Sequence, residues 1–218
     1  MNRASRRSRK RVAVLISGRG SNLAALVAAA RAGDYPAEIV AAISDRIDAA
    51  GLAFAQEMGI PASALPRSGH DSRASHEAAL GAALATAQAD LVCLAGFMRL
   101  MSRQFVEQWQ GRMINIHPSL LPAFKGLDTH ARALQAGVRI HGCSVHFVTA
   151  GMDDGPIIAQ AAVPVLPGDV EATLAARVLE AEHRLYPIAL RMLAEGRVQI
   201  REGRAIITRD GDGDASGV

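Results

Sequence analysis

The sequence predicts an α/β protein with a Rossmann-like, doubly wound and mostly parallel central sheet that has helices on both faces. Over roughly the first hundred residues, short aliphatic runs of strand length alternate with Ala- and Leu-rich segments of helical length. Near-continuous apolar runs are typical of parallel strands covered on both faces, and their alternation with helices indicates βαβ units. Because half of the residues are hydrophobic but only 4% are aromatic, we expect an aliphatic core.

The apolar runs and the breaks between them divide the chain into elements. Strand 11–17 runs into the glycine turn 18–22, and a helix follows over 23–32. The other elements expected in the first half are strands 37–44, 61–65 and 90–95 and helices 49–58 and 72–87. Those expected in the second half are strands 113–116, 140–149 and 157–165, a helix over 127–136, a helix over 169–194 interrupted around Tyr186 and Pro187, and a hairpin of 198–201 with 205–208.

Charge and composition favour a single domain over 11–208, between a basic disordered extension at 1–10 and a disordered tail at 209–218. Residues 1–11 hold six of the 24 Lys and Arg and none of the 21 acidic residues, so the rest of the chain has 18 basic residues and a net charge of −3. The sequence pI of about 9.3 therefore comes from the extension. Such extensions are usually solvated, and the body gives no indication of a nucleic-acid partner.

Targeting signals and cysteines point to the cytoplasm. No apolar run is long enough to cross a bilayer, and the extension lacks the apolar segment of a secretory signal, which leaves a transit peptide as a minor alternative. Cys93 and Cys143 lie in apolar runs without the spacing of a metal site. We therefore expect reduced thiols, no metal and no membrane partner.

The stretch 113–126, MINIHPSLLPAFKG, combines a short buried strand with polar residues at its end. Asn115 and His117 are two residues apart, so both side chains would emerge on the same face of the strand. An Asn side chain can donate to a developing oxyanion, and a His titrates near neutral pH, so the pair suits acyl transfer. The alternative is that the two side chains only satisfy backbone groups of the following loop.

Three further segments carry polar residues after predicted strands. Gly20, Ser21 and Asn22 stand between a strand and a helix, where N–H groups favour a phosphate; an ordinary turn with a Ser or Asn cap is the alternative. Residues 96–101 suit either a flat aromatic ligand or the core. The turn 151–156 holds two adjacent carboxylates and also fits a plain surface turn. We interpret His146, on the predicted strand 140–149, as a packed structural residue.

Five motifs occur in order along the chain: LISGRGSNL, AGFMRLMS, INIHPSLLPAFKGLDTHARAL, HGCSVHFVTAGMDDGPIIAQ and EAEHRLYP. With them, residues 11–200 resemble the phosphoribosylglycinamide formyltransferases of the folate-dependent formyltransferase superfamily. The resemblance implies transfer of the formyl group of 10-formyltetrahydrofolate to the amine of N1-(5-phosphoribosyl)glycinamide in de novo purine (IMP) biosynthesis. It also implies small-molecule substrates, no metal, and a monomer or homodimer.

The resemblance assigns roles to individual residues. It implies catalysis by Asn115, His117 and Asp153, phosphate binding by Gly20, Ser21 and Asn22, and ribose binding by Glu182. The implied folate-binding residues are Arg73, Met98, Arg99, Leu100, Met101, Asn115, Thr149, Ala150, Gly151, Met152 and Asp153.

Two positions depart from the family pattern, and three other functions stay open. Asp154 stands where many relatives have glycine, and Lys125 lies in a loop where Pro-Gly is also common. A 10-formyltetrahydrofolate deformylase would use the same Asn, His and Asp on water, but that family carries an extra N-terminal domain. A methionyl-tRNA formyltransferase would need a basic C-terminal domain. A non-catalytic ligand-binding module has no need of an acid–base pair.

Overall fold

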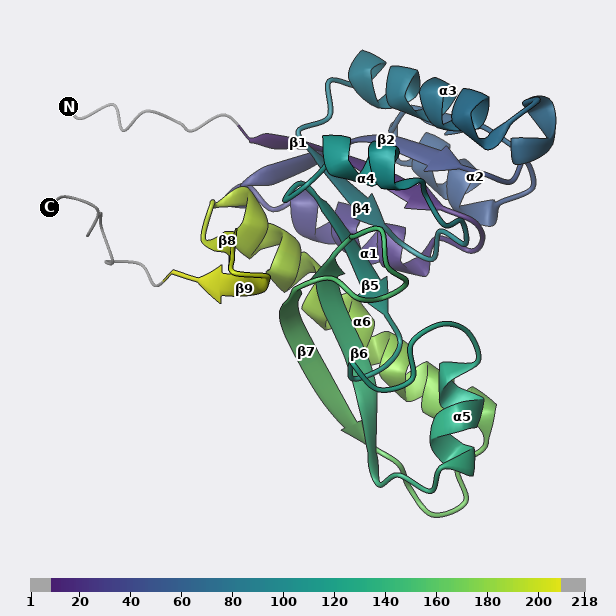
Figure 1. Ribbon diagram of the computed structural model, residues 1–218, viewed down its shortest axis with the longest axis vertical. Helices are drawn as coiled ribbons and strands as arrows, with labels where there is room; N and C mark the ends of the chain where they lie inside the picture. The colour runs from purple at the N-terminus through teal and green to yellow at the C-terminus, as the bar shows by residue number, and fades with distance from the viewer. Residues whose placement is uncertain (1–8, 209–218) are drawn as a thin grey trace, which may run out of the picture.

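A computed structural model describes residues 9–208 of the chain and has a seven-stranded sheet at its centre (Figure 1). The strands are β1 (Lys10–Ile16), β2 (Ala37–Ser44), β3 (Ala62–Ala64), β4 (Leu91–Leu94), β5 (Met113–His117), β6 (Ile140–Phe147) and β7 (Ile157–Pro164), with a separate hairpin of β8 (Val198–Arg201) and β9 (Arg204–Ile207). The helices are α1 (Ser21–Ala30), α2 (Ala50–Glu57), the 3-10 turn η1 (Arg67–Gly69), α3 (Arg73–Thr86), α4 (Arg103–Gln108), α5 (Thr129–Gln135) and α6 (Glu171–Ala194).

The strand order is β3-β2-β1-β4-β5-β6-β7. Strands β1 to β5 pair in parallel, and β6 runs antiparallel to both β5 and β7. After β1 the chain builds β2 and β3 on one side and then returns to place β4 on the other. Ligands of doubly wound sheets bind at such a switch point, outside the carboxyl ends of the strands. The predicted fold class is confirmed.

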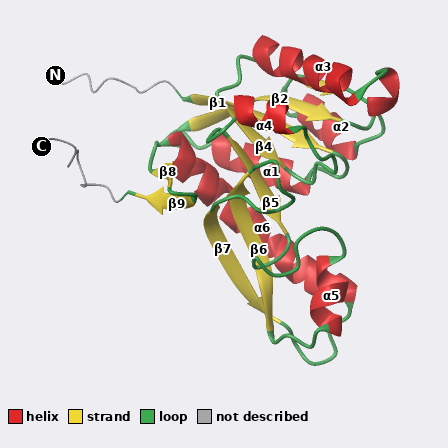
Figure 2. Ribbon diagram, in the orientation of Figure 1, coloured by secondary structure: helices red, strands yellow, loops and turns green. Residues whose placement is uncertain are grey.

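Alternating side chains of the strands bury both faces of the sheet. In β1, Val12, Val14 and Ile16 pack into one core cluster, and Ala13 and Leu15 pack into a second one on the opposite face. The first cluster contains residues of α1, α2, α5 and α6, and the second contains residues of α3 and α4. The helices therefore cover both faces, as the secondary-structure view shows (Figure 2).

The expected interruption of the last long helix around Tyr186 and Pro187 is wrong, because α6 is continuous and contains Pro187. Proline removes one N–H and usually kinks a helix. Here one face of the helix is buried in the core before and after the proline, through Tyr186 and Ala189, while Ile188 is exposed. The carbonyl oxygen of Pro187 also accepts a hydrogen bond from Tyr35 Oη at 2.7 Å. Tertiary packing thus outweighs the local preference of proline.

The start of β1 and the short helix α4 differ from expectation. Strand β1 begins at Lys10, inside the predicted extension, while residues 1–8 and the predicted tail 209–218 lie outside the described residues. The short helix α4 was not predicted; Ser102 caps it by accepting from the N–H of Phe105 at 3.2 Å. Its six residues are too few for a clear helical period, so the sequence pattern gives little sign of it.

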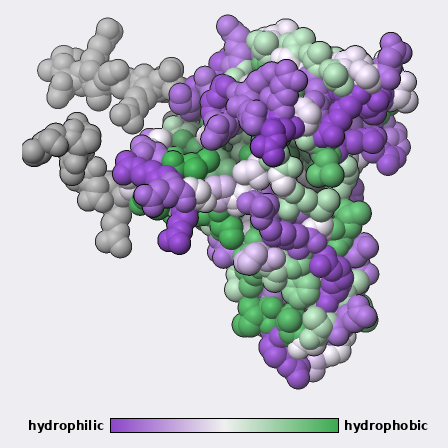
Figure 3. All heavy atoms as spheres, viewed as in Figure 1, coloured by the Kyte–Doolittle hydropathy of each residue, from purple (hydrophilic) through white to green (hydrophobic). Residues whose placement is uncertain are grey.

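The surface differs between the two ends of the molecule. On the face shown in Figure 3, hydrophilic side chains gather over α4, and apolar surface gathers at the free end of β6 and β7. Ile140, Leu166 and Val170 are among the exposed apolar residues near that end. Within residues 9–208, no helix has the length and apolar character that a membrane span requires.

Tyr186 joins α6 to the centre of the sheet and provides a test of the fold. Its buried hydroxyl lies 2.9 Å from the carbonyl oxygen of Leu94 and 3.1 Å from that of Ile114. We expect Tyr186→Phe to lower the free energy of unfolding by about 1 to 2 kcal/mol, because buried acceptors lose their donor. Urea unfolding measures the change, and Tyr35→Phe, which removes one part-buried hydrogen bond to the Pro187 carbonyl, gives a comparison for which we expect a smaller loss. An unchanged unfolding midpoint would show that the hydroxyl does not stabilise the sheet.

Candidate functional site

Asn115 and His117 project from the same face of β5 as Met113, while Ile114 and Ile116 pack into the opposite core. Asn115 pairs with Leu94, the last residue of β4, so it lies next to the loop that follows β4. His117 is the last residue of β5 and is buried. The two-residue spacing therefore places both side chains where the sequence predicts them.

His117 faces an oxygen acceptor at each ring nitrogen. Its Nδ1 lies 3.4 Å from Asp153 Oδ2, and its Nε2 lies 3.0 Å from the carbonyl oxygen of Phe124. A carbonyl oxygen can only accept, so Nε2 carries a proton. A carboxylate is likewise an acceptor. The ring therefore lies between two acceptors, the carboxylate on one side and the loop carbonyl on the other.

The structure distinguishes the two adjacent carboxylates of the turn after β6. Asp153 has a left-handed backbone (φ 47°), points inward, and accepts a hydrogen bond from the N–H of Gly126 at 2.9 Å. Asp154 is exposed and forms an ion pair with Lys125, which lowers the pKa of its carboxyl. The two departures from the family pattern therefore contact each other, outside the site, and Asp153 is the carboxylate that faces His117.

A cavity of about 100 Å³ lies beside Asn115. Its lining includes all of the residues predicted to bind folate except Arg73 and Met98: Arg99, Leu100, Met101, Asn115, Thr149, Ala150, Gly151, Met152 and Asp153. Leu94, Phe97, Val106, His146 and Val148 also line it and were not predicted. The loops after β4 and β6 thus form one hollow with apolar walls and a few polar groups, which is the usual character of a small-molecule site.

Two arginines at this hollow are held by buried acids. Arg99 donates from Nε to Asp45 Oδ2 at 2.6 Å. Arg73 donates from Nε to Glu77 at 3.0 Å and from Nη2 to the carbonyl oxygen of Leu100 at 2.7 Å. Arg73 therefore reaches the hollow through Leu100, although its own side chain does not line it.

The glycine turn after β1 brings Asn22 to Glu182 of α6. Gly20 has φ 77°, and a Cβ there would lie 2.7 Å from the Cα of Gly51, so only glycine fits. No side chain of residues 9–208 caps α1, so the alternative of an ordinary turn with a Ser or Asn cap is wrong, and the N–H groups of the first turn have no side-chain acceptor there. Asn22 donates from Nδ2 to Glu182 Oε2 at 2.7 Å. Burial raises the pKa of Glu182 and outweighs the effect of this hydrogen bond.

The turn and the hollow are neighbours. The N–H of Met98, in the loop after β4, donates to Oγ of Ser17, which follows β1, at 2.9 Å. The predicted phosphate-binding turn and the predicted folate loop therefore meet at the switch point between β1 and β4.

Comparison with known proteins assigns this arrangement to a family. A family model described as "Formyl transferase" matches residues 10–190. The chain belongs to the formyl transferase family. The phosphoribosylglycinamide formyltransferase of Escherichia coli (strain K12) is 44% identical over 194 residues, which cover 89% of this chain and 92% of that protein. The resemblance seen in the sequence motifs is confirmed.

Other members of the formyl transferase family differ in length. The human trifunctional purine biosynthetic protein adenosine-3 is 47% identical over 200 residues, and the chain spans only 20% of its length. A solved glycinamide ribonucleotide transformylase 1 from Symbiobacterium toebii is 48% identical, with a TM-score of 0.90 over 92% of this chain and 95% of that chain. A formyltetrahydrofolate deformylase from Pseudomonas syringae pv. tomato is more distant, at 26% identity and a TM-score of 0.85 over 93% of this chain and 67% of that one.

His146 is buried and hydrogen-bonded, as expected of a packed structural residue, but it also lines the hollow beside Asn115. Its Nε2 lies 3.2 Å from Asn115 Nδ2 and 3.7 Å from Asp153 Oδ1, and burial lowers its pKa. The alternation of side chains along β6 indicates that His146 lies on the other face of the strand from Cys143, Val145 and Phe147, which pack in the first core cluster. The missing information was which strand lies beside β6.

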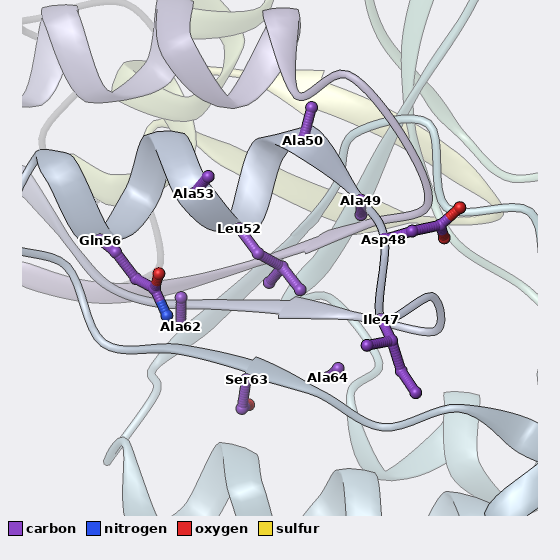
Figure 4. Close-up of a pocket in the computed structure, with 10 residues that line it drawn as sticks. All are labelled: Ile47, Asp48, Ala49, Ala50, Leu52, Ala53, Gln56, Ala62, Ser63 and Ala64. Atoms are coloured by element: carbon purple, nitrogen blue, oxygen red, sulfur yellow. The ribbon is translucent and has the colours of Figure 1, made fainter.

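A larger hollow of about 430 Å³ lies away from these residues, between α2, β3 and the segment before α2 (Figure 4). Its lining consists mostly of alanines with Ile47 and Leu52, and Asp48 is its one charged residue. Without an acid–base pair it offers no catalytic chemistry. Within the described part of the chain, no three His, Cys, Asp or Glu side chains are arranged to hold a metal ion.

A buried histidine beside His117 makes stability depend on pH. His141 is 1% exposed and lies edge-on to Phe124 and His130. Burial is the main cause that lowers its pKa to about 4, and nearby His130 and His117 add to the effect. The native ring is therefore neutral at pH values where an unfolded histidine is charged.

We expect the free energy of unfolding to fall as the pH is lowered from about 6.5 to about 4. In this range His141 binds a proton in the unfolded chain but stays unprotonated in the native state. In His141→Gln this slope should be smaller, by up to about 1.4 kcal/mol per pH unit. Urea unfolding of both proteins at several pH values measures the slopes. Equal slopes would show that His141 does not stay neutral in the native state.

Proposed function

We propose that this protein transfers the formyl group of 10-formyltetrahydrofolate to the amine of N1-(5-phosphoribosyl)glycinamide in de novo purine biosynthesis. The observation that carries the proposal is the contact of His117 Nδ1 with Asp153 Oδ2 at 3.4 Å, beside Asn115 and the hollow. Membership of the formyl transferase family supports it. The similar Escherichia coli protein is named for this activity.

The chemistry begins with the neutral amine of the acceptor, which attacks the formyl carbon. A carbon–nitrogen bond forms, and the formyl oxygen becomes an oxyanion in a tetrahedral intermediate. Two donors are available to this oxygen, the Nδ2 group of Asn115 and the Nε2–H of His117. The Nε2–H of His117 must first give up its hydrogen bond to the carbonyl oxygen of Phe124. One such donor is typically worth about 10²- to 10³-fold in kcat.

Collapse of the intermediate breaks the bond between the formyl carbon and N10 of the folate. The attacking amine must lose one proton, and N10 must gain one. Asp153 accepts the proton from the amine, directly or through a water, and its contact with His117 keeps the imidazolium in place. Asp153 then passes this proton to N10, directly or through a water, so the enzyme ends each cycle unchanged.

Binding is divided between the two neighbouring segments. The N–H groups of Gly20, Ser21 and Asn22 hold the phosphate at the N-terminus of α1, and Glu182 holds the ribose. The folate lies in the hollow beside Asn115, where Arg73 and Arg99 offer positive charge to its carboxylates. The remaining folate contacts are proposed for Met98, Leu100, Met101, Thr149, Ala150, Gly151, Met152 and Asp153. We expect no metal and a cytoplasmic location.

The alternative is a hydrolase, since a 10-formyltetrahydrofolate deformylase structure shares the fold at 26% identity. Water could then replace the amine as the nucleophile. The Gly20–Asn22 turn with its Asn22–Glu182 pair favours the transferase, because only a ribonucleotide acceptor gives both a ligand.

Acceptor dependence separates these functions. We expect purified protein to release deformylated folate from 10-formyltetrahydrofolate only when N1-(5-phosphoribosyl)glycinamide is present, with one formylated product per folate released. The two products are measured by absorbance and by mass spectrometry. Release at the same rate without the acceptor would assign the protein as a hydrolase instead.

Asn115→Ala and Asp153→Asn test the site. We expect Asn115→Ala to lower kcat by about 10²- to 10³-fold through loss of an oxyanion donor, and Asp153→Asn to lower it at least as much by removing the proton acceptor. Circular dichroism should show an intact fold. The matched control is Asp154→Asn, which removes the adjacent carboxylate outside the site and should leave kcat within about twofold. If Asp153→Asn and Asp154→Asn behave alike, the assignment of Asp153 is wrong.

A further inference from the structure

The pair Asn115 and His146 is set by the register of the sheet. The two residues lie opposite each other in the antiparallel β5–β6 ladder. His146 is 3% exposed, and its Nε2 lies 3.2 Å from Asn115 Nδ2. The side chains therefore meet across two strands of the rigid central sheet, and neither of them depends on a loop for its position.

The other ring nitrogen of His146 decides which group Nε2 presents. Nδ1 lies 2.9 Å from the carbonyl oxygen of Phe147, which can only accept, so Nδ1 carries the proton. Burial lowers the pKa of the ring, so it is neutral and Nε2 is left with a lone pair. Nε2 can then accept a hydrogen bond but cannot donate one.

Because His146 Nε2 can only accept a hydrogen bond, it fixes the orientation of the Asn115 amide. Its NH2 group must face His146, because its carbonyl oxygen there would meet another lone pair. One N–H is used in this hydrogen bond, and the second N–H remains for the hollow that Asn115 lines. With the amide flipped by 180°, the carbonyl oxygen would take the place of that N–H and would repel an oxyanion.

We propose that His146 is a positioning residue for formyl transfer, which holds the amide of Asn115 in the one orientation that donates to the oxyanion. The inference rests on the proposed function. His146 acts on Asn115 and not on Asp153. The distance from His146 Nε2 to Asp153 Oδ1 is 3.7 Å, which is too long for a hydrogen bond, and neither atom has a proton to donate.

The test compares His146→Phe with His146→Gln. Phenylalanine keeps the ring volume but has no acceptor, and glutamine can place its carbonyl oxygen near the position of Nε2. Both variants lose the donor to the Phe147 carbonyl, so they differ at Asn115 in particular. We expect His146→Phe to lower kcat about 10- to 100-fold with KM for both substrates within about twofold, and His146→Gln to recover at least fivefold of that loss.

A double-mutant cycle shows where the effect acts. Single-turnover rates are measured for His146→Phe in the wild-type, Asn115→Ala and Asp153→Asn backgrounds. We expect no further loss in Asn115→Ala, because no amide is left to orient, and the full loss in Asp153→Asn. The role of His146 would be overturned by an equal loss in the Asn115→Ala background, by a loss that disappears with Asp153→Asn, or by His146→Gln behaving like His146→Phe. Full formyl transfer by Asn115→Ala alone would instead contradict the proposed function.

Discussion

The contact between Asp153 and His117 is the constraint on which the rest of the site depends. The two residues are far apart in the chain, and they meet because β6 returns antiparallel to β5 and its following turn folds back over the end of β5. The left-handed backbone at Asp153 and the hydrogen bond from the Gly126 N–H hold the carboxylate in that position. The amide of Asn115, the His117–Asp153 pair and the hollow, to which we assign the chemistry, are thereby placed together.

Rigid and adjustable parts of the site have different origins. Asn115 and His146 stand on central strands, where register and core packing fix their positions. Asp153 and Phe124 stand on loops joined by the Gly126 hydrogen bond and the exposed Lys125–Asp154 pair. Exposed pairs of this kind stabilise little, so small movements of the loops are compatible with an intact sheet. This division suits the proposed mechanism, in which the Nε2–H of His117 exchanges its hydrogen bond to the Phe124 carbonyl for one to the substrate.

The sequence predicted those features that depend on neighbouring residues in the chain. The aliphatic runs gave the strands, and the spacing of Asn115 and His117 gave their common face, because side chains alternate along a strand. The continuity of α6 through Pro187 depends on the burial of one helix face before and after the proline, which no local pattern contains. The role of His146 depends on which strand pairs with β6 and in which register. Motif resemblance supplied Asp153, whereas the turn itself offered two equivalent carboxylates and no means of choosing between them.

The proposed arrangement of Asn115, His117 and Asp153 around the reacting groups can be tested by a crystal structure with N1-(5-phosphoribosyl)glycinamide and a folate analogue that cannot transfer its one-carbon unit. We expect the amine and the one-carbon unit to meet between Asn115, His117 and Asp153, with the phosphate at residues 20–22. The carbonyl oxygen of the one-carbon unit should lie about 2.7 to 3.1 Å from Asn115 Nδ2. An acceptor amine bound beyond the reach of Asp153, with Asn115 and His117 turned away from that oxygen, would contradict it.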